Sequence, residues 1–129
     1  MKLLLDTHTL LWMFLEPDKL APAARAALAD TETSLNISVA SLWEITIKIA
    51  KGQLVVPENS VQYVLKLVDA ARIPTLPIRP AHLVELQKLP RHHKDPFDRI
   101  LIAQSRAEQI PLVTVDKDIR EYDVQILWR

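Results

Sequence analysis

The chain has 129 residues, 49% of them hydrophobic, which suits one ordinary core, so we expect a single domain over residues 1–129. Sixteen basic residues balance sixteen acidic ones, which excludes a global field that attracts nucleic acid or an anionic membrane and restricts polyanion binding to a local patch. The absence of cysteine excludes a disulfide framework, a thiolate nucleophile and a cysteine zinc site. Because no signal-like or membrane-spanning apolar run is present, we expect a cytoplasmic protein without a membrane partner.

Hydrophobic periodicity and cap residues predict alternating strands and helices. Ser38 or Ser41 can cap one helix, and Gly52, the only glycine, suits the position just after its end. Long connections between strands indicate a parallel sheet of four or five strands with helices on both faces, a three-layer α/β/α fold. In chain order we expect a strand at 2–6, helices at 8–15 and 22–30, a strand at 34–38, helices at 40–51 and 58–72, a strand at 75–78, helices at 80–88 and 96–109, and strands at 111–115 and 124–128.

Two short apolar runs at opposite ends of the chain each stop at an aspartate. Residues 2–5 lead to Asp6, and residues 111–115 lead to Asp116. An apolar run of this length is typical of a strand buried on both faces, as in parallel sheets. The carboxyl ends of such strands form the ligand crevice, so the two aspartates can meet there. Two carboxylates at a crevice indicate a divalent metal.

Two further acidic residues lie in otherwise apolar helices. Glu44 is one turn before Lys48, and an exposed i,i+4 ion pair is its plainer interpretation. Asp95 suits the N-cap of the helix at 96–109, and Asp98 in the first turn complements the helix dipole. Structural roles alone can account for these acids, but the complete set favours an acidic site at one edge of the sheet.

Four short motifs resemble the acidic positions of PIN-domain ribonucleases. They are Leu-Leu-Leu-Asp-Thr-His around Asp6, Ser-Leu-Trp-Glu-Ile around Glu44, Asp-Pro-Phe-Asp-Arg around Asp98 and Leu-Val-Thr-Val-Asp around Asp116. The resemblance runs nearly end to end and is closest to the VapC-type toxins of VapBC toxin–antitoxin pairs, which share the Asp-Pro-Phe-Asp-Arg and terminal Leu-Trp signatures. It implies a PIN-like fold.

The resemblance implies a metal-dependent endoribonuclease whose products carry 5′-phosphate and 3′-hydroxyl ends. Carboxylate ligands suit Mg²⁺, with Mn²⁺ as a substitute, and such ions activate water and stabilise the leaving oxygen. Our hypothesis is that Asp6 and Asp98 anchor the main metal, while Glu44 and Asp116 complete its surroundings and orient water. A metal-free route through the 2′-hydroxyl is disfavoured, because no pair of histidines is placed across a scissile bond.

A basic cluster of Arg91, Lys94 and Arg99 lies beside Asp98. Contacts from such a cluster to the phosphate backbone position RNA without specifying its sequence. Alternatively, Arg99 only pairs with Asp95. Three weaker candidates for substrate binding are Lys48, Thr7 and Thr114.

The histidines and tryptophans receive mainly structural interpretations. His92 and His93 are expected to be solvated or to contact phosphate rather than to bind metal. His8 either touches the site or has a capping or packing role, and His82 is expected on the surface of its helix. A place in the core or an interface is favoured over base stacking for Trp12, Trp43 and Trp128.

The resemblance also implies partners: an RNA substrate, a VapB-type antitoxin whose C-terminal segment occludes the acidic site, and a second copy in a homodimer. Apolar residues at 8–15 and 40–51 exceed the needs of one small core and favour a groove for a partner helix. A phosphatase of the haloacid-dehalogenase type is a second function class, but it needs another aspartate where His8 stands. The third class is a silent PIN fold that only binds RNA or protein, against which the presence of all four acids argues.

Overall fold

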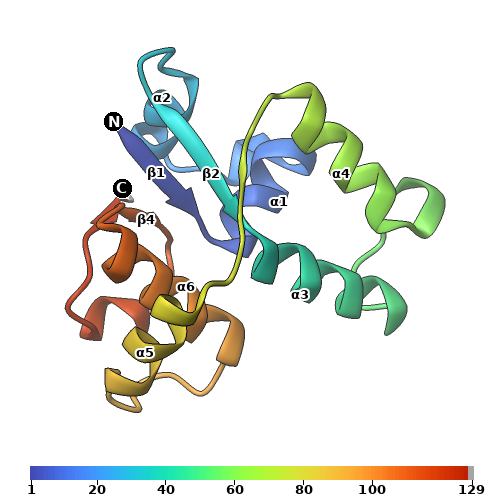
Figure 1. The fold of residues 1–129 in the computed structure, drawn as a ribbon. Helices are drawn as coiled ribbons and strands as arrows, with labels where there is room; N and C mark the ends of the chain where they lie inside the picture. The colour runs from blue at the N-terminus through green and yellow to red at the C-terminus, as the bar shows by residue number, and fades with distance from the viewer. Residues whose placement is uncertain (128–129) are drawn as a thin grey trace.

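The computed structural model describes residues 1–127 and shows a five-stranded parallel sheet in the order β3-β2-β1-β4-β5 (Figure 1). The predicted parallel α/β fold is therefore confirmed. The strands are β1 (Lys2–Leu5), β2 (Ser34–Ser38), β3 (Thr75–Leu76), β4 (Leu112–Val113) and β5 (Ile126–Leu127). The α-helices are α1 (Thr7–Leu15), α2 (Pro22–Ala29), α3 (Val39–Ala50), α4 (Val61–Ala70), α5 (Pro80–Lys88) and α6 (Pro96–Glu108), and the short 3₁₀ turns are η1 (Pro17–Lys19), η2 (Pro57–Asn59) and η3 (Ile119–Glu121). None of these described helices has the length and apolarity needed to cross a membrane.

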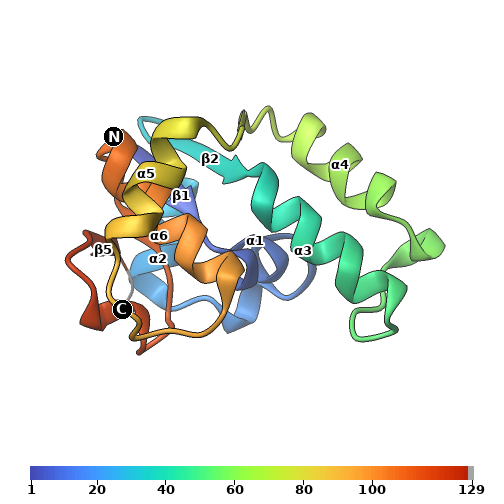
Figure 2. The ribbon, with the colours of Figure 1, turned by 60° about the horizontal axis from the view of Figure 1, so that its bottom comes forward.

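β1 is the central strand of the sheet, and its three leucines are buried on both faces. Leu3 and Leu5 pack into one cluster with apolar residues of α1 to α4, whereas Leu4 packs into a second cluster with α6. Figures 1 and 2 show α5 and α6 on one side of β1 and α1 and α2 on the other. Successive strand residues point to opposite faces, so the unbroken leucine run supplies both cores.

The carboxyl ends of three strands lie side by side. Leu5 of β1 is paired with Ile37 of β2 and with Val113 of β4. The chain winds one way from β1 to β3 and the other way through β4 and β5, so the switch point is between β1 and β4. Ligands of open α/β sheets bind beyond the strand ends at this point, and Asp6 and Asp116 follow these two strands.

Three predicted helix-end positions, at Ser38, Gly52 and Asp95, are confirmed. The Ser38 hydroxyl accepts a hydrogen bond from the Ala40 N–H at 3.0 Å and caps α3. Gly52, with a φ of 72°, takes the left-handed conformation just after the end of α3. The Asp95 carboxylate accepts from the Phe97 N–H at 2.9 Å and caps α6.

The helix expected at 58–72 begins later, because a 3₁₀ turn precedes it. Glu58 and Asn59 have φ values of 65° and 47°, which a continuous α-helix does not allow. The Ser60 hydroxyl accepts from the Gln62 N–H at 3.1 Å, and α4 starts at Val61.

Three strands are shorter than expected. The strand at 75–78 ends at Leu76, before Pro77, which has no N–H for a ladder hydrogen bond. The strand at 111–115 contains only Leu112–Val113, and the last strand only Ile126–Leu127. The expected end of that strand at Trp128 lies outside the described residues.

The prediction that His82 lies on the surface of its helix is wrong. Its side chain is completely buried. Nδ1 accepts from the Arg79 N–H at 2.9 Å, and Nε2 is 2.8 Å from the Glu108 carboxylate. The imidazole therefore ties the start of α5 to the end of α6.

Candidate metal centre

Asp6 is fixed at the carboxyl end of β1 by both backbone and side-chain hydrogen bonds. Its N–H donates to the Val113 carbonyl at 3.1 Å, and its Oδ1 accepts from the Thr9 N–H at 2.8 Å. The second contact makes Asp6 the N-cap of α1. Thr114 also hydrogen-bonds the carboxylate. Only 2% of Asp6 is exposed, so the carboxylate is held in place before any ligand arrives.

Glu44 reaches the same edge from α3. Its Oε1 accepts from the Thr7 hydroxyl at 2.7 Å, and its Oε2 is 3.1 Å from the Lys48 ammonium. The i,i+4 ion pair is thus present, but the interpretation of Glu44 as an exposed residue is wrong, since only 6% of it is accessible. The negative charge of Glu44 also raises the pKa of Asp98.

Asp98 and Asp116 meet around His93. The His93 Nε2 lies 2.9 Å from Asp116 Oδ2 and 3.1 Å from Asp98 Oδ2. One ligand atom from each of the three residues falls within 4.8 Å of the others, a spacing compatible with a metal ion. Asp98 belongs to the first turn of α6 and Asp116 follows β4, so two separate elements deliver these carboxylates.

Crowded negative charge shifts the acid–base equilibria of the centre. The pKa of Asp98 is raised to about 7, first by burial and then by the charges of Asp95, Asp6 and Glu44, with His93 acting in the opposite direction. Burial likewise raises the pKa of Asp6, although hydrogen bonds to its carboxylate oppose this effect. A cation relieves such repulsion. The donor set, made of carboxylate oxygens, fits a hard ion such as Mg²⁺ or Mn²⁺.

The contact between His93 and Asp116 shifts the pKa of both residues. Burial acts to raise the pKa of Asp116, but hydrogen bonds from His93 and from the Asp118 N–H outweigh it, and this pKa is lowered. Burial acts to lower the pKa of His93, yet its hydrogen bond to Asp116 and the charges of Asp98 and Asp95 raise it overall. Of the two carboxylates beside His93, Asp116 therefore stays ionised more readily than Asp98.

The three basic residues expected beside Asp98 differ in their exposure. Arg91 and Lys94 are exposed in the segment before α6. The Arg99 guanidinium donates to the Leu89 carbonyl at 3.4 Å. Among the described residues it makes no ion pair with Asp95, which caps the helix instead.

Sequence reasoning missed His93. It placed this residue in a solvated loop, whereas the structure half-buries it between two carboxylates. One local signal existed, because a histidine two residues before an N-cap can accept from its N–H, as His93 Nδ1 does from Asp95 at 3.0 Å. His8 packs its ring against Trp12, with 5.8 Å between the centroids, which agrees with the packing alternative.

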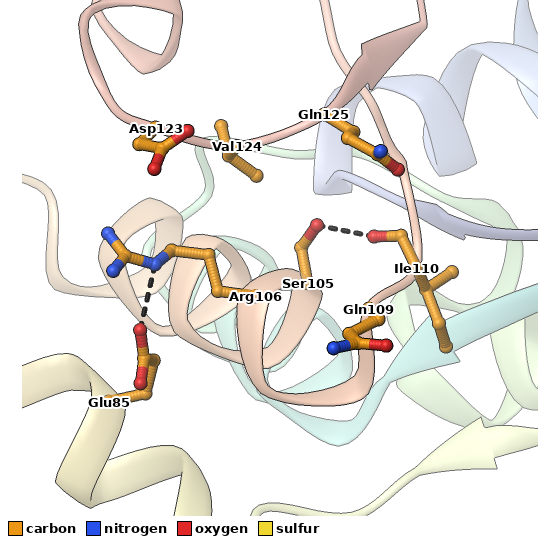
Figure 3. A pocket seen from close by; sticks show the side chains of 8 residues that line it. All are labelled: Glu85, Ser105, Arg106, Gln109, Ile110, Asp123, Val124 and Gln125. Atoms are coloured by element: carbon orange, nitrogen blue, oxygen red, sulfur yellow. Dashed lines mark hydrogen bonds and ion pairs between the residues drawn. The ribbon is translucent and has the colours of Figure 1, made fainter.

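A separate hollow of about 630 Å³ lies away from these carboxylates. Figure 3 shows it between the end of α6 and the segments that lead into β4 and β5, with Arg106 Nε donating to Glu85 Oε1 at 2.8 Å across its floor. Ile110 and Gln125 line it and precede their strands, so it faces the amino edge of the sheet. The acidic centre and this hollow are therefore on opposite edges.

Comparison with known proteins agrees with this geometry. The family model of the PIN domain matches residues 3–125. Among solved structures, VapBC2 from Rickettsia felis bound to promoter DNA matches with a TM-score of 0.76 at 16% identity, over 100% of both chains. DNA-bound VapBC from Salmonella typhimurium gives 0.69 at 18% identity over 98% of this chain and 97% of that one, and VapBC-5 from Mycobacterium tuberculosis gives 0.66 at 18% over 99% and 98%. No curated protein matches significantly. The chain belongs to the PIN domain family.

Proposed function

We propose that this protein is a metal-dependent endonuclease that hydrolyses RNA phosphodiester bonds. One observation carries the proposal: Asp6, Glu44, Asp98 and Asp116 converge at the carboxyl edge of β1 and β4 in a PIN domain. The raised pKa of Asp98 supports a cation at this place, since the carboxylates repel one another without one.

Asp6 and Asp98 hold the main ion, Mg²⁺ with Mn²⁺ as its substitute, and Glu44 and Asp116 complete its surroundings and orient water. The bound ion supplies the Lewis acidity that phosphodiester hydrolysis requires. The protein orients two of the carboxylates in advance. The hydrogen bond from the Thr9 N–H fixes Asp6, and the hydrogen bond from the Thr7 hydroxyl fixes Glu44. Such fixed ligands need little rearrangement when substrate arrives.

Basic side chains near the acidic residues in the sequence provide contacts for RNA. Exposed Arg91 and Lys94 can reach backbone phosphates on the side of α6. Lys48 already neutralises part of the charge of Glu44, which reduces repulsion of an incoming phosphate. The proposed RNA contacts are Arg91, Lys94, Arg99 and Lys48. The two threonines expected as weaker candidates, Thr7 and Thr114, are buried and hydrogen-bond Glu44 and Asp6, so they support the carboxylates instead of contacting RNA.

A VapB-type antitoxin is the proposed inhibitor. Three of the solved structures that share this fold are described as VapBC. A groove of about 350 Å³ runs beside α1 and the end of α3, with Leu11, Leu15, Leu54 and Val55 along it and Lys48 at its border. An apolar helix suits such a groove. Hydrogen exchange should slow in α1 when antitoxin is added, and unchanged exchange there would contradict this docking site.

The proposed homodimer uses an apolar face formed by α3, α5 and α6. Trp43, expected in the core or an interface, is 59% exposed, and Leu83 and Ile78, which line the same apolar hollow, are 53% and 39% exposed. Trp43 packs edge-on against Phe97, with 5.1 Å between ring centroids. Clustered exposed apolar residues typically mark an interface. The Trp43→Glu variant should sediment as a monomer, and an unchanged dimer would exclude this face.

Cleavage of labelled total RNA tests the nuclease. Purified protein, free of antitoxin, is incubated with Mg²⁺, Mn²⁺ or EDTA beside the Asp6→Asn and Asp98→Asn variants. We expect metal-dependent cutting that both variants abolish, with 5′-phosphate and 3′-hydroxyl ends. Undiminished activity in EDTA, or products with 2′,3′-cyclic phosphate, would refute the proposed mechanism.

A further inference from the structure

His93 is held firmly from two directions. Its backbone N–H donates to the Tyr122 hydroxyl at 2.8 Å, and its ring Nδ1 accepts from the Asp95 N–H at 3.0 Å. The Asp95 carboxylate in turn caps α6. The imidazole is therefore positioned by the same few residues that start the helix carrying Asp98.

The hydrogen bond from Asp95 decides which nitrogen of the neutral ring carries the hydrogen. Because Nδ1 accepts, its lone pair is in use and the hydrogen resides on Nε2. Nε2 faces Asp116 Oδ2 at 2.9 Å and Asp98 Oδ2 at 3.1 Å. The Nε2–H hydrogen-bonds Asp116 and contacts Asp98, and a nitrogen that carries a hydrogen has no lone pair to offer a metal ion.

We propose that His93 is a positioning residue of the nuclease centre, which ties Asp98 to Asp116 through its Nε2–H and is not itself a metal ligand. This inference rests on the proposed metal-dependent function. Two carboxylates from different elements repel each other, and a positively polarised N–H that lies between them keeps their oxygens within reach of one ion. Partners that orient metal-binding side chains in this way are a general feature of metal sites.

The remaining contacts of Asp116 agree with this role. Its Oδ1 accepts from the Asp118 N–H at 2.8 Å, while its Oδ2 receives His93. Each carboxylate oxygen can accept more than one partner, so both stay available to a cation while their direction is fixed. Among the described residues no hydrogen bond orients the Asp98 carboxylate, so it depends on its 3.1 Å polar contact with the His93 Nε2 more than Asp116 does.

Mn²⁺ binding measured by calorimetry tests the inference without a substrate. Removing a residue that orients metal ligands typically weakens affinity about 10-fold or more, so we expect this loss in His93→Ala. His93→Gln places an amide N–H near the position of Nε2 and should restore most of the affinity. His92→Ala is the matched control, since this neighbouring ring contacts Tyr122 and Glu121 rather than the carboxylates. Thermal unfolding of each variant verifies that it is folded.

Pulsed EPR of bound Mn²⁺ separates positioning from direct ligation. We expect no directly coordinated imidazole nitrogen in the wild-type complex. A nitrogen coupling that disappears in His93→Gln would make His93 a ligand and overturn the inference, as would unchanged Mn²⁺ affinity in His93→Ala. Failure of the wild-type protein to bind Mn²⁺ would instead overturn the proposed function, and this inference with it.

Discussion

Replacement of Asp98 by asparagine should stabilise the metal-free protein at alkaline pH. The pKa of Asp98 is about 7 in the folded protein and 3.8 in its ordinary state. A carboxyl with a raised folded-state pKa contributes stability at low pH that is lost as the pH rises through that value. Asparagine resembles the protonated carboxyl and does not titrate, so the variant should escape this loss.

The size of the effect follows from the two pKa values. A full separation of about 3 units corresponds to roughly 4 kcal/mol, of which about 2 to 3 kcal/mol accrues between pH 5 and pH 8. The lowered pKa of Asp116 acts only at lower pH, as protonation approaches its shifted value. The raised pKa of Asp6 has the same sign as that of Asp98 and remains in both proteins.

Urea denaturation in EDTA at pH 5 and pH 8 measures this difference. Wild-type protein should lose more unfolding free energy than Asp98→Asn by about 2 to 3 kcal/mol over this interval. Asp69→Asn is the matched control, because its side chain lies exposed on α4. Saturating Mg²⁺ should restore the wild type at pH 8 more than the variant. Equal pH dependence in wild type and Asp98→Asn would refute the electrostatic reasoning.

Three further substitutions test the structural supports. Thr7→Val leaves Glu44 Oε1 without its 2.7 Å donor and should cost about 1–3 kcal/mol in urea denaturation; a neutral effect would show that the hydrogen bond is not formed. His82→Ala removes a fully buried ring and its contact with Glu108 and should lower the unfolding free energy by about 2–5 kcal/mol, whereas a loss below about 0.5 kcal/mol, as at surface positions, would contradict the burial. Gly52→Ala meets no atom within 4 Å, but φ is +72°, so only backbone strain opposes it and we expect a loss of about 1 kcal/mol by the same assay; a stability gain would contradict that conformation.

Features set by neighbouring residues could be predicted from the sequence. The leucine run of β1, the Ser38 cap and the left-handed Gly52 depend on contacts within a few positions. The parallel sheet followed from the lengths of the connections. Its strand order, β3-β2-β1-β4-β5, was not predicted, because it depends on which strands pair across the whole chain.

Features set by distant contacts were misjudged. His82 is buried because α6 delivers Glu108 to it from 26 residues away. His93 joins the centre because Asp116, 23 residues further on, folds against it. Glu44 carries the surface pattern of an i,i+4 ion pair, yet Thr7 and the packing of α3 bury it. Sequence motifs predicted the four acidic site residues, and the fold shows what surrounds each of them.

Anomalous diffraction from crystals grown or soaked with Mn²⁺ tests the central claim most directly. We expect a manganese peak among the carboxylates of Asp6 and Asp98, with Glu44 and Asp116 adjacent and with the ring of His93 outside the ion's ligands. A peak at another part of the molecule, or no peak at Mn²⁺ concentrations that support RNA cleavage, would contradict a metal-dependent centre at the carboxyl edge of β1 and β4.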